Sequence, residues 1–398
     1  MDEKERLIDV LDQEIEEKRA VGTQLILANE GIVTFSYSNG LTDINKGRRP
    51  NSQSIYRIYS MTKPVTAVIA AMLNETGLLD YSMPIAEYLP EFSTMKVLKD
   101  TKEIPCRKLI TVWDLLNMTS GIVYPDSDSI GLRMNNIFLP IQEKIMQGKE
   151  YSTEEIVQKI ATCPLAFEPG TAWRYGFSAD VLGRIIEVVS GKKLRDVFRE
   201  KLFDPLGMND TDFYVPEEKR DRLVVLYKKD NNNFIEDNNR HLGLTDGKRI
   251  PKFLSGGAGL YTTVSDYCNF LSMLSMGGVF QGRRYLLKET VDNFSRNQLT
   301  SMQLRTTGYL PQMRNYGYGH LMRVYIKASS ADSIGYEGEF GWDGWTGPYF
   351  SVDLKHQQFI LYMTQISGYS NWNTIYSIRN HAFNIFQNRG IENELSER

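Results

Sequence analysis

The order of strand-like and helix-like segments along the chain is the strongest constraint on its fold. Two short apolar runs flank Asn29-Glu30-Gly31, the pattern of a β-hairpin, because Asn and Gly accept the positive φ of tight turns. Aromatic and β-branched runs return near the other end, in YGYGHLMRVYI, GPYFSVDLK and QFILYMTQI. Between these ends the sequence is helical and rich in loops. One antiparallel sheet built from both ends of the chain, with a helical insertion, satisfies this order.

Several helices are predicted from apolar periodicity and glycine stops. One runs from about Ser60 to Thr76 before Gly77, and others lie in TVWDLLNMTSG, TEEIVQKIATCPL and SADVLGRIIEVVSG. Amphipathic helices are also predicted at the N-terminus and in NTIYSIRNHAFNIF, and KKDNNNFIEDNNR reads as a solvated turn or hairpin tip. The predicted architecture is α+β, with a sheet domain over 1–80 and 231–398. A mainly helical domain spans 81–230, and we expect the active site in the cleft between the two.

Composition excludes several classes of function. The chain has 398 residues and a net charge of −3, so it lacks the basic excess of nucleic-acid-binding proteins. It shows no apolar run long enough to span a membrane and no signal-peptide core, which indicates a cytoplasmic protein. Three widely spaced cysteines fit reduced thiols, and no two of the four histidines are spaced i, i+4. We therefore expect no metal and no cofactor.

The segment Ser60-Met61-Thr62-Lys63 carries the first sign of chemistry. Residues at i and i+3 share one face of a helix, so the Lys63 amine can reach the Ser60 hydroxyl. The start of a helix also favours negative charge developing at that serine. An N-capping serine with an exposed lysine is the structural alternative, and the motif alone does not decide between them.

Two later segments supply possible partners for this pair. Tyr175 closes the segment Pro169–Tyr175 just before a predicted helix, where a nearby Lys63 cation would lower the pKa of its phenol and make phenolate usable as a base. The glycine-rich segment Glu339–Pro348 could offer free N–H groups that polarise a carbonyl together with the Ser60 N–H. Alternatively, Tyr175 is an aromatic residue of the core, and the segment Glu339–Pro348 is a tight hairpin.

Taken in order, these motifs resemble the serine β-lactamase-related superfamily, nearest to class C β-lactamases and family VIII carboxylesterases. The matching segments are Tyr59–Pro64, Asp114–Gly121, Glu168–Tyr175, Ser178–Gly183, Gly256–Leu260 and Gly341–Gly344. The resemblance implies a β-lactamase/transpeptidase-like fold, with Ser60 as nucleophile and Lys63 and Tyr175 sharing the proton transfers. It also implies an oxyanion hole from the backbone N–H groups of Ser60 and Trp345. Substrate contacts would come from Trp342, Asp343, Gly344 and Phe177.

Two departures from the family pattern bear on the substrate. Tyr175-Gly176-Phe177 replaces Tyr-x-Asn, and Trp342-Asp343-Gly344 replaces Lys-Thr-Gly, so the groups that hold a β-lactam side chain and carboxylate are missing. Asp343 should also repel anions. Met118 stands where many relatives have histidine, which indicates a structural role for that motif.

The leading hypothesis is hydrolysis of an uncharged ester or amide through an acyl-enzyme on Ser60. The alternatives are a β-lactamase, a D-amino-acid peptidase, an acyltransferase and a catalytically silent sensor domain. The expected partner is a small ester, amide or lactam substrate, with no nucleic acid and no membrane, and the protein is expected to be a monomer or a homodimer.

Overall fold

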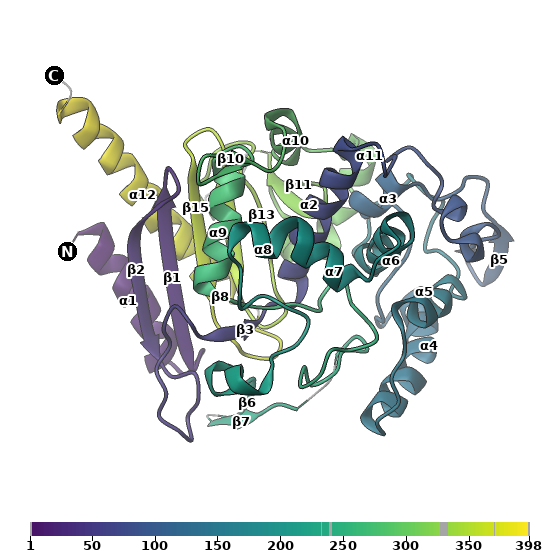
Figure 1. The fold of residues 1–398 in the computed structure, drawn as a ribbon, viewed down its shortest axis with the longest axis horizontal. Coiled ribbons are helices and arrows are strands. Elements are labelled where there is room, and N and C mark those ends of the chain that lie inside the picture. The colour runs from purple at the N-terminus through teal and green to yellow at the C-terminus, as the bar shows by residue number, and fades with distance from the viewer. Residues whose placement is uncertain (1, 232, 239–240, 327–332, 370, 397–398) are drawn as a thin grey trace.

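The computed structural model describes residues 2–231, 233–238, 241–326, 333–369 and 371–396, with side chains up to Gln387 (Figure 1). Across these ranges the largest sheet is antiparallel and has seven strands in the order β11-β12-β13-β14-β15-β1-β2. Its strands are β1 Gly22–Asn29, β2 Ile32–Gly40, β11 Tyr316–Gly319, β12 Met322–Tyr325, β13 Phe340–Asp343, β14 Tyr349–Asp353 and β15 Gln358–Met363. Strand β1 pairs with β15, with Leu25 opposite Tyr362, so the two ends of the chain share one sheet as the sequence predicts.

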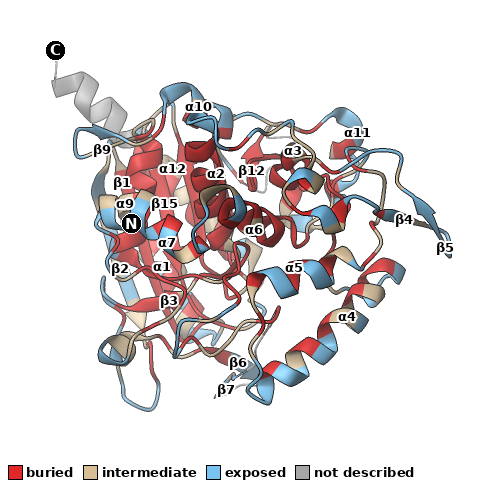
Figure 2. Ribbon diagram, turned by 45° about the vertical axis from the view of Figure 1, so that its right-hand side comes forward, coloured by how far each residue is buried: buried red, intermediate tan, exposed pale blue. Residues whose placement is uncertain are grey.

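The sheet is covered on both faces. On one face α1 (Glu3–Glu16) and α12 (Trp372–Ser396) form a cluster with strand residues such as Leu25 and Tyr362 (Figure 1). On the other face α9 (Val264–Ser275) packs against β14 and β15. Helix α2 (Thr62–Glu75) is buried along residues 62–73 and lies at the centre of the molecule (Figure 2). A helix that is buried all round belongs to the core, so the residues at its start are held firmly.

The middle of the chain supplies most of the remaining helices. These are α3 Val112–Leu116, α4 Ser129–Met146, α5 Thr153–Ala161, α6 Ser178–Ser190, α7 Leu194–Phe198 and α8 Asp204–Leu206. Helix α6 ends at Gly191, whose φ of 65° is left-handed, as the glycine stop predicts. The insertion is not all-helical, because β4 (Lys96–Lys99) and β5 (Lys102–Pro105) form a hairpin around Asp100. The division at residues 80 and 230 stays a prediction.

Smaller elements connect these layers. Strand β3 (Ile55–Arg57) pairs with β8 (Tyr261–Thr263), which places the residues before Ser60 beside the segment 256–261. Strands β6 (Tyr227–Asp230) and β7 (Asn233–Glu236) form the predicted hairpin, of which residues 232, 239 and 240 lie outside the described residues. The other elements are β9 Val279–Phe280, β10 Arg283–Arg284, α10 Lys288–Phe294 and α11 Ser301–Leu304. Over the described ranges no helix has the length and apolarity to cross a membrane.

Candidate active site

Ser60 lies at the junction between strand β3 and helix α2. A single 3-10 turn, Tyr59–Met61, joins the two elements, and Tyr59 has a φ of 42°. Left-handed φ is uncommon for an aromatic residue, and such strained positions gather at functional sites. The Ile58 N–H donates to the Leu260 carbonyl at 3.1 Å, so β8 fixes the turn. The sequence thus presents a half-buried Ser60 at the start of a rigid helix.

The Lys63 amine is fully buried and has three oxygen partners. Its Nζ lies 3.1 Å from Ser60 Oγ, 3.0 Å from the Tyr124 hydroxyl and 2.8 Å from the Gly257 carbonyl. Burial lowers the pKa of Lys63 to about 7, although the carboxylates of Asp180 and Asp343 oppose the shift. Lys63 can therefore exist as a neutral amine near neutral pH, which is the form that accepts a proton from serine.

Asp180 positions Lys63 through the segment 255–257. Its buried carboxylate accepts from Ser255 Oγ at 2.5 Å and from the Gly257 N–H at 3.1 Å. A Cβ on Gly257 would lie 2.6 Å from Asp180 Oδ2, so only glycine allows this approach. Thr66 Oγ1 donates to the Gly256 carbonyl at 2.6 Å and ties the same segment to α2. The Gly257 carbonyl thus faces Lys63 because both sides of the segment are fixed.

Tyr175 completes the group around Ser60. Its hydroxyl is hydrogen-bonded to Ser60 and accepts from Trp342 Nε1 at 3.1 Å. Lys63 Nζ lies 4.6 Å from the centre of its ring. The expectation that Lys63 lowers the pKa of Tyr175 is wrong, because burial raises the pKa of this phenol far above its ordinary value. Tyr175 is therefore protonated at neutral pH, whereas Lys63 can be neutral there.

Tyr124 belongs to this group, although no pattern in the sequence pointed to it. Its hydroxyl accepts from Lys63 Nζ at 3.0 Å, and its ring meets the Tyr175 ring edge-to-face at 5.4 Å. Phe177 packs against Tyr124 at 4.5 Å and stacks on Phe138 at 4.4 Å, with 1% of its surface exposed. Phe177 therefore supports Tyr124 from the core, and the structure does not place it at the site surface. Only its position three residues after the matching segment Asp114–Gly121 could have drawn attention to it.

Strand β13 contributes Trp342 and Asp343 to the group of side chains around Ser60. Trp342 is 2% exposed and presents its indole N–H to Tyr175. Asp343 forms an ion pair with Arg323, which is buried and lies 5.4 Å from the Trp342 ring. The Arg323 guanidinium offsets the charge of Asp343, so the repulsion of anions that the sequence predicts is weakened, and it stays a prediction. The sequence could not show this partner, which comes from strand β12.

The turn after β13 packs on the backbone that precedes Ser60. A Cβ on Gly344 would lie 2.5 Å from the Ile58 carbonyl, so glycine permits the close approach. The Gly344 N–H closes the turn on Pro348 at 2.8 Å, whereas no backbone carbonyl of the described residues accepts from the Trp345 N–H. The Trp345 ring meets Tyr59 edge-to-face at 5.2 Å. The predicted oxyanion hole of Ser60 and Trp345 remains a prediction, and this packing is consistent with it.

Comparison with known proteins defines the class. The β-lactamase family model matches residues 7–374. The esterase EstB of Burkholderia gladioli is 27% identical over 379 residues, 90% of this chain and 89% of that protein. The solved structure of EstCE1, described as a hydrolase with promiscuous acyltransferase activity, aligns with a TM-score of 0.79 at 22% identity, covering 95% and 98% of the two chains. Simvastatin synthase LovD of Aspergillus terreus aligns with a TM-score of 0.79 at 18% identity, covering 96% and 98%.

The chain therefore belongs to the β-lactamase family. Within that family it is a serine hydrolase related to carboxylesterases, which confirms the resemblance read from the ordered motifs.

Proposed function

We propose that this protein hydrolyses carboxylic esters through an acyl-enzyme on Ser60. One observation carries the proposal: a buried lysine with a pKa of about 7 lies 3.1 Å from the Ser60 hydroxyl. A serine becomes a useful nucleophile only when a base takes its proton, and this geometry supplies the base. The esterase relative supports ester as the substrate class.

Acylation follows from the positions of three groups. The neutral Lys63 amine takes the Ser60 proton while Oγ attacks the ester carbonyl, and the oxyanion that forms accepts from the backbone N–H groups of Ser60 and Trp345. The carbonyl–alkoxide bond then breaks, and the protonated Tyr175 hydroxyl donates its proton to the departing alkoxide. The resulting phenolate is stabilised by the Lys63 ammonium over its ring and by the Trp342 N–H.

Deacylation reverses the proton movements. Water gives a proton to the Tyr175 phenolate and attacks the acyl carbonyl as hydroxide. The bond to Ser60 Oγ breaks, and Oγ recovers its proton from the Lys63 ammonium. Each group ends in its starting protonation state, and the net reaction consumes one ester and one water.

Two features favour an ester over a β-lactam. The strand position that would carry a lysine for a β-lactam carboxylate is Trp342, and its indole N–H is already bound to Tyr175. The position that would carry an amide is Phe177, which is packed in the core. Neither group that would orient a β-lactam is therefore available at these two positions.

The test compares p-nitrophenyl butyrate with nitrocefin, each with the wild-type protein and with Ser60→Ala. We expect ester turnover that disappears in Ser60→Ala and little turnover of nitrocefin. Turnover of the ester by Ser60→Ala at the wild-type rate would overturn the mechanism. Hydrolysis of nitrocefin with kcat/KM above about 10⁴ M⁻¹s⁻¹, the range of efficient enzymes, would move the function to β-lactam chemistry.

Acyl transfer to an alcohol is a second candidate, because the proposed acyl-enzyme differs only in which nucleophile enters second. The description of EstCE1 as a hydrolase with promiscuous acyltransferase activity supports it. Adding a primary alcohol to the ester assay and measuring the new ester against free acid separates the two activities. A product mixture dominated by new ester at low alcohol concentration would favour the transferase.

A further inference from the structure

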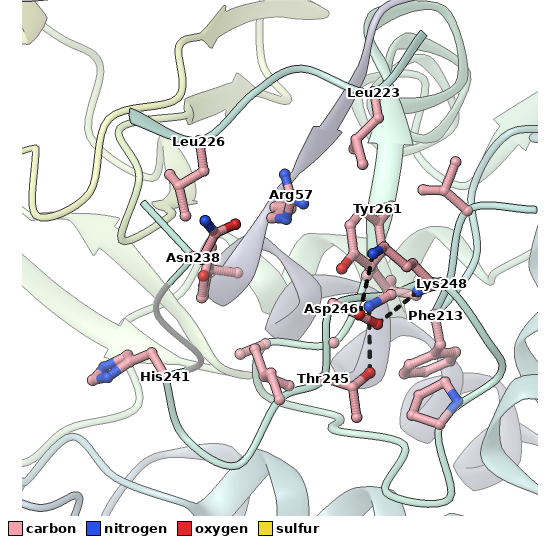
Figure 3. A pocket seen from close by; sticks show the side chains of 18 of the residues that line it. Arg57, Phe213, Leu223, Leu226, Asn238, His241, Thr245, Asp246, Lys248 and Tyr261 are labelled. Atoms are coloured by element: carbon pink, nitrogen blue, oxygen red, sulfur yellow. Dashed lines mark hydrogen bonds and ion pairs between the residues drawn. The ribbon is translucent and has the colours of Figure 1, made fainter. Parts of the chain in front are cut away.

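A cavity of about 310 Å³ reaches Tyr59, the residue before Ser60. Its lining consists of Arg57, Tyr59, residues 258–261 and residues between 213 and 253. Figure 3 shows Arg57 with Leu226 and Asn238 on one side and Tyr261 on the other. Apolar walls with a few polar groups are the usual composition of a small-molecule site.

Two arginines of this cavity have no carboxylate partner among the residues that the structure describes. Arg57 NH1 donates to the Val224 carbonyl at 3.1 Å, and Arg57 lies over the Tyr261 ring at 5.5 Å. Arg220 donates only to the carbonyls of Val215 and Lys248. In the described parts of the chain every other buried or half-buried arginine, from Arg19 to Arg379, forms an ion pair with a carboxylate. The two exceptions line the same cavity, which points to an anion supplied from outside the chain.

The carboxylates of the cavity are already engaged. Asp237 Oδ2 accepts from Ser367 Oγ at 2.5 Å. Asp246 accepts from the Lys248 N–H at 3.1 Å, and its other oxygen lies 3.8 Å from Lys248 Nζ. His241 and Tyr59 do not add charge at neutral pH, because burial lowers the pKa of His241 and raises that of Tyr59 to well above neutrality. The cavity is thus lined by three cationic side chains, Arg57, Arg220 and Lys248, against the two carboxylates of Asp237 and Asp246, so its net charge is positive.

The cavity lies next to the proposed acyl side of the reaction. Trp345, which is part of the proposed oxyanion hole, stacks on His241 at 4.8 Å and meets Tyr59 edge-to-face at 5.2 Å, and both of these residues line the cavity. The leaving group must lie at Tyr175, which contacts a different set of aromatic rings, including Trp342 and Tyr124. With the leaving group on that side, the acyl arm of the substrate extends past Tyr59.

We propose that this cavity binds a carboxylate at the far end of the acyl arm, with Arg57 and Arg220 as its ligands, so that the preferred substrates are half-esters of dicarboxylic acids. The inference rests on the proposed ester hydrolysis and specifies its substrate class. A guanidinium matches a carboxylate with two parallel N–H···O bonds, and the apolar walls accommodate the methylene chain. The carboxylate end fixes the arm, and the ester end then meets Ser60.

The experiment compares mono-p-nitrophenyl esters of dicarboxylic acids, from succinate to suberate, with the same esters capped as methyl esters at the far carboxyl. The capped ester has the same arm without its charge, so the ratio of the two kcat/KM values isolates recognition of the anion. A charge-assisted hydrogen bond implies roughly a 10- to 100-fold preference for the free carboxylate at the best chain length. High salt lowers this ratio if the guanidinium ions are responsible.

Variants assign the preference to the arginines. Arg57→Met and Arg220→Met should each lower the ratio about 10-fold or more, since each loses a charge-assisted bond, whereas Arg57→Lys should retain part of it. Arg249→Met is the matched control, because Arg249 is exposed, follows the lining residue Lys248 and does not itself line the cavity. If Arg57→Met fails to fold, Arg220→Met alone decides.

The outcomes separate this inference from the proposed function. Ser60-dependent turnover of capped and free esters with a ratio near unity at every chain length would overturn the carboxylate site and leave ester hydrolysis intact. A preference that both arginine variants retain would also overturn it. Absence of Ser60-dependent turnover for every ester would instead contradict the proposed function.

Discussion

The dependence of ester hydrolysis on pH follows directly from the surroundings of Lys63. Burial lowers the pKa of this amine from 10.5 to about 7. The shift corresponds to roughly 5 kcal/mol of preference for the neutral form, at 1.36 kcal/mol for each pH unit. Because only the neutral amine can take the Ser60 proton, kcat/KM should rise with pH and level off above about 7. Two pH units below the midpoint only about 1% of the amine is neutral, so kcat/KM should be roughly 100-fold below its plateau.

Asp343→Asn provides a second test, because the reasoning predicts the direction in which the pKa of Lys63 shifts. The Asp343 carboxylate favours the protonated amine, so its removal should lower the pKa of Lys63 further and move the rising limb to lower pH. Arg323 then loses its counter-ion, which adds a shift in the same direction. The assay is kcat/KM for p-nitrophenyl butyrate from about pH 5 to 9, where the profile reports ionisations of the free enzyme. A rising limb near the ordinary lysine pKa, or a shift to higher pH in Asp343→Asn, would refute the assignment of Lys63 as base.

Four further predictions concern the same group of side chains. Tyr175→Phe removes the proton donor for the leaving group and should lower kcat/KM by roughly 10²- to 10⁴-fold, with an unchanged circular dichroism spectrum. Trp342→Phe removes the N–H that stabilises the Tyr175 phenolate, so kcat should fall about 10-fold with little change in KM. Tyr124→Phe removes a hydrogen-bonding partner of the Lys63 amine and should likewise lower kcat about 10-fold, whereas an unchanged kcat would make Tyr124 a packing residue. Lys63→Met should raise the melting temperature below about pH 7, where burying the protonated amine costs the wild-type protein most, and this advantage should shrink towards pH 10.

The sign of that last prediction follows from proton linkage. An unfolded Lys63 keeps its ordinary pKa of 10.5, whereas the folded protein releases the proton at about 7. Between these values the unfolded state binds more protons, so the stability of the wild-type protein rises with pH. Below about 7 both states are protonated and the full penalty applies. If the difference in melting temperature between wild type and Lys63→Met stays constant between about pH 7 and pH 10, the lowered pKa of Lys63 is contradicted.

The sheet and several of the helices could be predicted from the sequence because local signals were strong. Strand composition at both ends predicted one sheet built from both ends of the chain, which the pairing of β1 with β15 confirms, and Gly191 marked the end of α6. Helix α4 was missed, because Pro140 and two asparagines are poor helix formers. Its helical form is supported by burial of Ile130, Met134 and residues at the same spacing beyond them, and by Asp128, which caps its first turn.

The site could be predicted in its residues but not in its electrostatics. The spacing of Ser60 and Lys63 is local, and the structure brings both together with Tyr175. Desolvation is a property of the whole fold, so the shift in the pKa of Tyr175 predicted from the sequence has the wrong direction. Likewise, the charge of Asp343 is offset by Arg323, which approaches from the neighbouring strand. Tyr124 reaches Lys63 across a separation of 61 residues, for which no local pattern exists.

The most direct test of the central claim is to trap the acyl-enzyme and locate it. The reaction with p-nitrophenyl butyrate is quenched in acid during its initial burst phase. The protein is then digested, and the masses of its peptides are measured by mass spectrometry. We expect the mass of one butyryl group on the peptide that contains Ser60, and no such adduct in Ser60→Ala. Turnover without any adduct on that peptide, or an adduct on another residue that persists in Ser60→Ala, would contradict the mechanism.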